Sequence, residues 1–242
     1  MQEFPSLSEI EENTRVETLN REGKALTVIE NLLNQYLSGF QHIGEFKRTD
    51  DNRLEQVWLL LTLRAFNSLR WGYYLLQSGY YSQSMMLTRS ALEDWLVCKD
   101  CEGHVDTVEA VLDWEKHVPT FKAMADRLPE KLQLVWKEAF TDDGIYGFLS
   151  TFAHPRYRAI HVLFDPDTKL LSLGPSYDEH LFLITCYSLF RPMIWLLEFL
   201  LYRLVDPVAP DWKAEAQPVM NQAHKSSDQL LTRAKALLKA TE

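Results

Sequence analysis

The sequence predicts an all-α protein, a multi-helix bundle built on a long antiparallel helical hairpin. Apolar residues recur at spacings of three and four through most of the 242-residue chain, which is the spacing of one helix face. Glycine is scarce, at nine residues, and the apolar–polar alternation typical of strands is nearly absent. The length favours a single domain over residues 1–242.

The chain begins with an acidic segment, residues 1–20, that we expect to fray. A first helix is predicted from about Arg21 to Phe46 because one of its faces is apolar. That face carries Leu26, Ile29, Leu32, Leu33, Tyr36 and Phe40. The opposite side is polar, so this helix is expected at the surface of the bundle.

The central hairpin is predicted from two long helices joined by a glycine turn. Residues 51–77 contain no proline and one glycine, and apolar side chains occupy nearly every side, as in a central helix. Ser78 and Gly79 supply the turn, because glycine readily adopts the left-handed conformation that ends a helix. The second helix is expected from Ser82, a candidate cap, to about Asp100.

Shorter helices are expected next, with prolines between several of them, over residues 105–115, 120–127, 129–139 and 143–152. The segment Asp165-Pro166-Asp167-Thr168 has the composition of a turn and lies between two short extended runs. It predicts a small β-hairpin over residues 161–174.

The C-terminal third is predicted to contain a long apolar helix, a loop and an amphipathic helix. The apolar helix covers about residues 178–204, and Pro192 is expected to kink it. Residues 206–212 form the loop, which contains two prolines. The last helix is expected from about Ser226 to Ala240.

Charge and cysteine content bear on partners and location. The chain has 34 acidic against 25 basic residues, a net charge of −9, which disfavours RNA as a partner. Three cysteines are too few for a disulfide scaffold, and no export signal is evident, so a cytoplasmic protein is expected. The apolar stretch 181–204 contains Arg191, Glu198 and Arg203, and we therefore expect no membrane span.

A zinc site is a weak candidate at Cys98, Cys101 and His104. Two thiolates and an imidazole at this spacing suit zinc, but a fourth ligand is not evident, although His117 is within reach. Free cysteine is also a frequent core residue. We favour the core interpretation and expect no cofactor.

A polar node inside the bundle is predicted from Arg89 and Glu93, which lie four residues apart and interrupt an apolar stripe. Charges on a buried face need compensation, and Arg64 or Arg70 from the preceding helix is positioned to join the pair. A structural role for this node is favoured over a catalytic one.

The segment around residues 150–161 is the richest in polar chemistry. Ser150 and His154 lie four residues apart and share a helix face, but a nucleophile would also need a carboxylate and an oxyanion site. Arg156, Arg158 and His161 join His154 in the one dense cationic patch of the sequence. This patch suits a phosphate or carboxylate, although solvated loop charges are the favoured interpretation.

The hairpin from Leu75 to Glu93, with its Arg-Ser-x-x-Glu element, resembles a group of uncharacterised prokaryotic all-α proteins, as does the later Ser150 and His154 pair. That group is distantly similar to the HEPN superfamily, whose bundles often dimerise and include metal-independent ribonucleases with an Arg-x(4–6)-His motif. Arg156 and His161 match this spacing. The resemblance implies that the arginine would bind the scissile phosphate and the histidine would act as general base or polarise the 2′-hydroxyl.

We therefore expect a non-enzymatic helical binding or regulatory module, acting as a homodimer or with a protein partner. Seven Trp and ten Tyr are more aromatic surface than a modest core needs, and aromatic residues anchor interfaces. The dimer is expected to bury the second apolar side of the helix at residues 181–204. The alternative is a HEPN-like endoribonuclease that uses Arg156 and His161, so whether the chain is an enzyme stays open.

Overall fold

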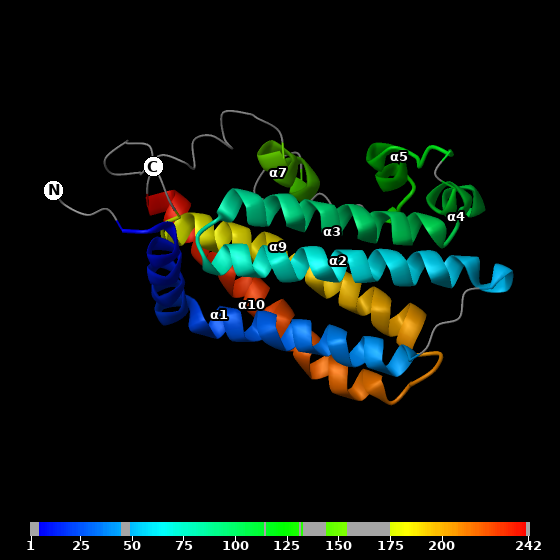
Figure 1. Ribbon diagram of the computed structural model, residues 1–242, viewed down its shortest axis with the longest axis horizontal. Helices are drawn as coiled ribbons and strands as arrows, with labels where there is room; N and C mark the ends of the chain where they lie inside the picture. The colour runs from blue at the N-terminus through cyan, green and yellow to red at the C-terminus, as the bar shows by residue number, and fades with distance from the viewer. Residues whose placement is uncertain are drawn as a thin grey trace.

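The structure is a computed structural model that describes residues 5–44, 49–113, 115–130, 132, 144–153 and 175–240. This part of the chain contains eight α-helices, a short 3-10 helix η1 (Asp50–Asn52), a π-helical segment η2 (Leu200–Val205) and no strand (Figure 1). The all-α prediction is confirmed for these residues. The predicted β-hairpin at 161–174 and nearly all of the predicted helix at 129–139 lie outside them.

The predicted hairpin is formed by α2 (Arg53–Gln77) and α3 (Tyr81–Cys101), which pack against each other. Gly79 has a φ of +79°, and a Cβ there would lie 2.7 Å from the carbonyl oxygen of Ser176. The hydroxyl of Ser84 donates to the carbonyl oxygen of Gly72 at 2.8 Å and fixes the register of the pair. The predicted cap is wrong, because α3 begins before Ser82, at Tyr81.

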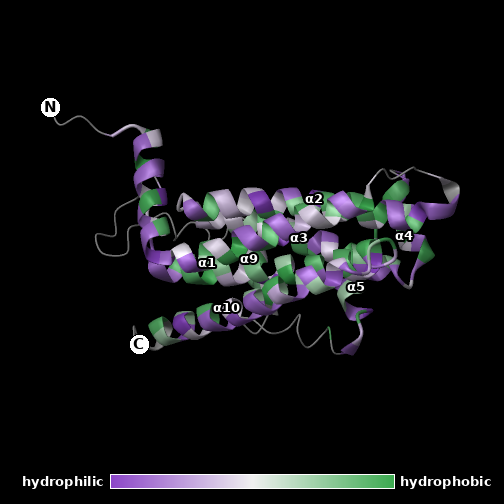
Figure 2. Cartoon of the chain, turned by 90° about the horizontal axis from the view of Figure 1, so that it is seen from below, coloured by the Kyte–Doolittle hydropathy of each residue, from purple (hydrophilic) through white to green (hydrophobic). Residues whose placement is uncertain are grey.

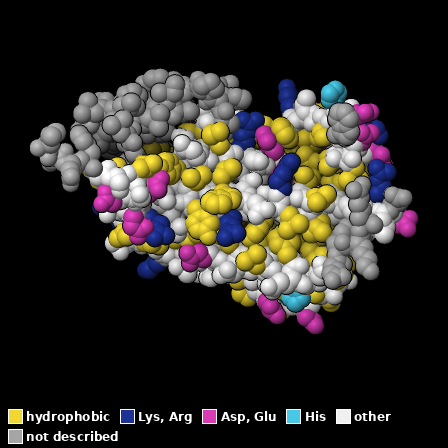
Figure 3. Space-filling model, viewed as in Figure 1, with side chains coloured by type: hydrophobic (Ala, Val, Ile, Leu, Met, Phe, Trp, Pro, Cys, Tyr) yellow, Lys and Arg dark blue, Asp and Glu magenta, His cyan; other side chains and the backbone are white. Residues whose placement is uncertain are grey.

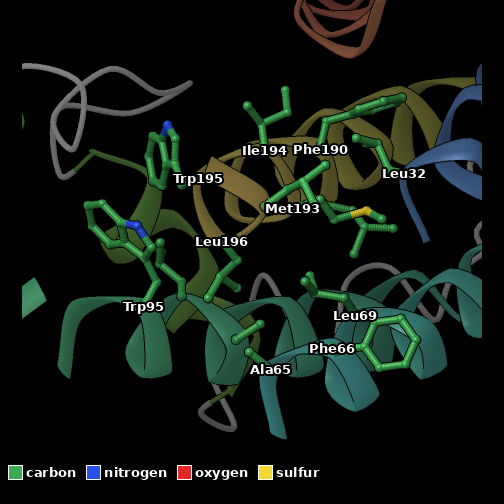
Figure 4. Close-up of a cluster of buried hydrophobic side chains, with 14 of the residues drawn as sticks. Leu32, Ala65, Phe66, Leu69, Trp95, Phe190, Met193, Ile194, Trp195 and Leu196 are labelled. Atoms are coloured by element: carbon green, nitrogen blue, oxygen red, sulfur yellow. The ribbon is translucent and has the colours of Figure 1, made fainter. Parts of the chain in front are cut away.

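The centre of the bundle is α9 (Glu179–Phe199), which begins where the Asp178 carboxylate accepts a hydrogen bond from the Leu181 amide at 2.7 Å. Figure 4 shows Met193 and Leu196 on the side of α9 that faces α2 and α3. Trp195 lies next to Trp95 of α3, at a centroid distance of 5.0 Å. The helix continues through Pro192, and the irregular backbone comes later, in η2.

The apolar helix is buried within one copy of the chain. The segment Glu179–Val205 is the one helix of the described part long and apolar enough to cross a membrane, and 83% of its most apolar stretch is buried inside the protein. The prediction that a dimer partner buries a second apolar side of this helix is therefore wrong. Within this segment Tyr202 of η2 is the one large apolar residue that is exposed; the other exposed large apolar residues of the described chain lie outside it.

The first helix, α1 (Leu7–Ile43), begins far earlier than predicted, so the expectation that residues 1–20 fray is wrong from Leu7 onward. Ser6 and Glu9 form a capping box, in which the Ser6 amide donates to the Glu9 carboxylate at 2.7 Å. Two long-range bonds hold this segment. Thr14 donates to the carbonyl of Pro175 at 3.1 Å, and Tyr80 donates to Glu11 at 2.6 Å.

The last helix, α10 (Trp212–Ala240), also begins earlier than the predicted Ser226 and includes Pro218. It packs on α1 and α9 through a stripe of buried residues, Trp212, Ala216, Met220, Ala223, Leu230 and Ala234. The Trp212 ring fits against Gly39 of α1, where a Cβ would lie 2.8 Å from a ring carbon. The indole also donates to the Ser38 hydroxyl at 3.0 Å.

Three short helices cover the outer side of α3, as Figure 1 shows. They are α4 (Val105–Leu112), α5 (Phe121–Asp126) and α7 (Gly144–Ala153), and each contacts α3. On the opposite side of the bundle, Figure 2 shows α1 and α10 next to each other with hydrophilic residues on their outer surfaces.

Candidate functional site

The predicted polar node exists and has a third member. The Arg89 guanidinium donates to the Glu93 carboxylate and to the Tyr146 hydroxyl, both at 2.9 Å, and Tyr146 donates to Glu93 at 3.1 Å. The guanidinium also lies 5.0 Å from the centre of the Tyr146 ring. The side chains of Arg89 and Glu93 are 17% and 21% exposed, so the node lies at the rim of the bundle. Partial burial of Tyr146 raises the pKa of its hydroxyl.

Arg64 joins a different carboxylate from the one predicted. It donates from two guanidinium nitrogens to Asp94 of α3, with Nε at 3.0 Å from both carboxylate oxygens. The Asp94 side chain is 0% exposed, whereas Arg64 is 64% exposed. Burial raises the pKa of Asp94, and the hydrogen bonds from Arg64 oppose that rise. Arg70, the other predicted partner, lies instead over the ring of Tyr74 at 5.7 Å.

Of the predicted serine and histidine pair, the structure describes only Ser150. Its hydroxyl donates to the Tyr146 carbonyl one helical turn earlier, at 2.7 Å. His154, Arg156, Arg158 and His161 lie outside the described residues. The ribonuclease alternative, which depends on Arg156 and His161, therefore stays a prediction.

The weak zinc candidate is not assembled. Cys98 and Cys101 are buried in the core, and His104 places its Nδ1 3.0 Å from the carbonyl oxygen of Asp100. In the described ranges, no three His, Cys, Asp or Glu side chains lie together in a way that could hold a metal ion. Cys98 and Cys101 occupy core positions, as the favoured interpretation of the sequence predicts.

The buried cysteines give a chemical prediction. Burial raises the pKa of Cys101 to about 12 and also raises the pKa of Cys98 and Cys186. Since the thiolate is the reactive form, all three are expected to react with a maleimide at pH 7 about 100-fold more slowly than an exposed thiol. Intact-mass counting of labels should find three only after urea is added. An Asn34→Cys variant, exposed on α1, provides the fast reference.

Rapid labelling of any native cysteine in the folded protein would contradict this prediction.

The burial of the cysteines is also expected to make the protein less stable at high pH. The unfolded chain loses thiol protons near pH 9, whereas folded Cys101 keeps its proton until about pH 12, so stability falls as the pH rises across that window.

A groove of about 840 Å³ lies between α1 and α10, next to a bend in α1. The bend is at Glu22, whose backbone is not helical (φ −122°, ψ 15°). The buried Glu22 carboxylate accepts two hydrogen bonds from Arg233 of α10, at 2.8 and 2.9 Å, and one from the Tyr177 hydroxyl at 3.0 Å. Arg233 also binds Glu179 at 2.9 Å.

The groove is lined by more cations than anions. Arg21, Lys24, Lys225 and Arg233 contribute to its walls, against one carboxylate, Glu22. Arg21 is paired with Glu17, but Lys24 and Lys225 are exposed and make no ion pair with any described residue. Amides and hydroxyls complete the polar part of the lining, from Asn20, Gln222, Gln229, Thr27 and Ser226. Leu19, Ala25, Val28 and Leu230 form its apolar part.

A second distinctive surface follows the outer side of α2. Its exposed residues are Leu60, Leu63, Arg64, Asn67, Arg70, Trp71 and Tyr74, which we call the α2 face. Trp71 and Leu60 are 62% and 58% exposed. Figure 3 shows hydrophobic side chains gathered over this region, with Lys and Arg among them. The α2 face contains no acidic residue, although the whole chain carries a charge of −9.

No family model matches this chain, and the searches of curated proteins and of solved structures also found no significant match. The resemblance to HEPN-related proteins therefore stays a prediction. Fold and surface together define a helical bundle with a cationic groove and an exposed aromatic face.

Proposed function

We propose that this chain is a non-enzymatic, homodimeric helical module that binds an anionic ligand in the groove between α1 and α10. The observation that carries the proposal is the excess of cations around the groove in a protein whose net charge is −9. The groove volume of about 840 Å³ lies within the range of roughly 300–1,000 Å³ typical of small-molecule sites.

The two lysines would supply the attraction for the ligand. Lys24 and Lys225 stand on different helices, so a ligand with two anionic groups can bind both. Arg233 is already oriented by Glu22 and Glu179, which lowers the conformational entropy that a further contact would cost. The chemical class expected is a small molecule with two or more carboxylate or phosphate groups and an apolar part that packs on the exposed side chain of Leu19.

Binding is tested by calorimetric titration with tripolyphosphate and with citrate. The double variant Lys24→Glu/Lys225→Glu is expected to bind either probe at least about tenfold more weakly than the unchanged chain, because it replaces attraction by repulsion. The control is Lys235→Glu together with Lys213→Glu, which makes the same charge change on α10 outside the groove. Affinity should also fall as the salt concentration rises.

Equal loss of affinity in the groove variant and the control would show that net charge alone attracts the probe. Absence of binding by the unchanged chain to both probes would contradict the anionic ligand class. Neither result tests the homodimer. That part of the proposal is tested by light scattering, which compares the molar mass in solution with the 28.2 kDa of one chain.

The homodimeric part of the proposal is supported by the α2 face. Trp, Tyr and Arg are the residue types most enriched among the energetic centres of protein interfaces, and Trp71, Tyr74 and Arg70 lie together there. The aromatic rings of Trp71 and Tyr74 already pack against each other at a centroid distance of 5.7 Å. A large exposed aromatic pair on a soluble surface is typical of an interaction site.

A further inference from the structure

The two parts of α1 on either side of its bend are held very differently. Figures 1 and 2 show residues 7–21, which we call the arm, turned sharply away from the direction of the rest of the helix. Beyond the bend, Ile29, Leu32 and Tyr36 are fully buried in the core. The arm supplies no apolar side chain to the core of the described chain, and its two buried residues are Thr14 and Thr18. The arm is therefore held to the bundle much less firmly than the rest of α1.

Polar contacts hold the arm in its present position. Away from the bend, Thr14 donates to the carbonyl of Pro175 at 3.1 Å, and Tyr80 donates to the Glu11 carboxylate at 2.6 Å. We call these two hydrogen bonds the tethers. Each replaces a hydrogen bond that water would make, so their net contribution is small compared with the apolar burial that holds the later part of α1.

The bend itself is imposed by tertiary contacts. Sharp kinks usually lie at proline, and α1 contains none near Glu22, while Gly23 keeps helical backbone angles. Glutamate also favours a helix. What distinguishes Glu22 is its buried carboxylate, which accepts two hydrogen bonds from Arg233 and one from Tyr177. These contacts hold Glu22 away from the helical backbone angles that the local sequence favours.

The arm has enough local stabilisation to move as one helix. Ser6 and Glu9 cap its first turn, and Arg15 pairs with Glu12 at 2.7 Å. These bonds lie within the arm and persist when its direction changes. In a straight α1 the arm would continue the helix of residues 23–43, so no new helix has to be nucleated.

We propose that α1 exchanges between the bent form seen here and a straight form, and that an anion bound in the groove selects the bent form. This proposal rests on the proposed function and names how that site is regulated. In the bent form, Leu19, Asn20 and Arg21 of the arm complete the groove lining opposite α10. Straightening changes the positions of all three, so the ligand site is complete only in the bent form.

Arg233 supports the same conclusion. Its guanidinium is oriented in the groove wall by Glu22 and Glu179, at 2.8 and 2.9 Å. If Glu22 takes up helical backbone angles, Arg233 loses the carboxylate that binds it with two hydrogen bonds. The cationic side chain that the ligand needs is therefore ordered best in the bent form.

The two forms couple the arm to the ligand. A ligand that binds only the bent form has an apparent affinity that is reduced in proportion to the fraction of chains that are bent. Linkage then requires that loosening the arm weakens the ligand and that the ligand holds the arm. Thr14 and Tyr80 lie outside the groove lining, so their effect on the ligand must pass through the arm. The direction of the arm thereby displays whether the groove is occupied.

The bend can be measured by electron spin resonance, as the distance between nitroxide labels on Asn13→Cys and Asn34→Cys in the full chain. Asn13 lies on the arm, Asn34 lies beyond the bend, and both are exposed. The three native cysteines are buried and stay unlabelled. At a rise of about 1.5 Å per residue, a straight helix would separate the two Cα atoms by about 32 Å, and the bent form by less. The free chain should show both separations, and saturating tripolyphosphate should leave the shorter one.

Removal of the tethers tests the coupling. Thr14→Val/Tyr80→Phe is expected to raise the ratio of long to short separations at least about threefold. In calorimetry it should weaken tripolyphosphate by the same factor by which the bent fraction falls. The matched control is Tyr73→Phe, which removes a phenol–carboxylate bond of the same length, 2.6 Å, to Glu30 beyond the bend. It should change neither the separations nor the affinity.

The outcomes separate this proposal from the proposed function. If the free chain shows one short separation that the tether variant leaves unchanged, the straight form is wrong, whereas ligand binding in the groove stands. If tripolyphosphate binds without changing the ratio of the two separations, the selection of the bent form is wrong. If the unchanged chain binds neither tripolyphosphate nor citrate, the proposed ligand class and its coupling to the arm are both wrong, and the distances alone decide whether α1 has two forms.

Discussion

Replacement of Arg64 by leucine is expected to lower the free energy of unfolding by about 3 kcal/mol at pH 7, because it leaves the buried Asp94 carboxylate without its partner. The loss lies at the low end of the range for broken buried pairs because Arg64 is largely exposed to water. The converse change, Asp94→Asn, should cost only about 1 kcal/mol, because Arg64 then stays solvated. Urea denaturation measures both.

The loss caused by Arg64→Leu should shrink as the pH falls from 7 to 5. Burial raises the folded-state pKa of Asp94, and removal of Arg64 raises it further. A carboxyl with a raised folded-state pKa takes up its proton in the folded protein first, so lower pH favours the folded state. Equal losses for Arg64→Leu and Asp94→Asn, or a loss that does not change with pH, would contradict this account.

Trp212→Ala is expected to lower the free energy of unfolding by about 4 kcal/mol, the largest effect proposed here. Trp212 is the largest side chain among those almost fully buried, and it joins α10 to α1. Its removal leaves a cavity between these helices and an unpaired Ser38 hydroxyl. Thermal or urea unfolding of the purified variant provides the measurement.

A double-mutant cycle with Gly39 tests the cause of that loss. Gly39→Ala should destabilise the unchanged chain by about 1–2 kcal/mol, because the added methyl group would lie within 3 Å of the Trp212 ring. In the Trp212→Ala background the same change should cost much less, because only the Leu200 methyl group, at 2.9 Å, then lies in the way and it can move into the space that the indole leaves. Gly23→Ala, with open space around its Cβ, is the control. Losses that simply add would contradict the packing account.

The central hairpin and the core helix could be predicted because local sequence determines them. Gly79 is required at a turn with positive φ, and the apolar run in α9 is too long to lie at the surface. Both features are visible within a window of 20–30 residues. Chain segments with such strong local signals fold as their patterns indicate.

The start of α10 could not be predicted because its stabilisation is non-local. The start of α1 had one local signal, the capping box of Ser6 and Glu9, but residues 7–20 lack a strong apolar face. Their helix is also held by the bonds from Thr14 to Pro175 and from Tyr80 to Glu11. The first turns of α10 are held by Trp212, whose partner Gly39 lies in the first helix.

The candidate sites were predictable only in part, for a similar reason. Spacing on one helix identified Arg89 and Glu93, but not Tyr146, which comes from α7. Asp94 was overlooked beside Glu93, because its burial depends on how α3 rotates against α2. The groove joins Lys24 and Lys225 from the two ends of the sequence, and no local pattern connects them.

The packing of the first helix against the last ones has a consequence for synthesis on the ribosome. Ser38 and Trp212 are 174 residues apart, and Tyr36 donates to the Met193 carbonyl at 2.5 Å. At translation rates of about 5–20 residues per second, α1 emerges roughly 10–35 seconds before α10. During that interval α1 can already pack on α2, as Tyr36 does on Phe66, but the part of its apolar face that contacts α9 and α10 must wait until the end of synthesis.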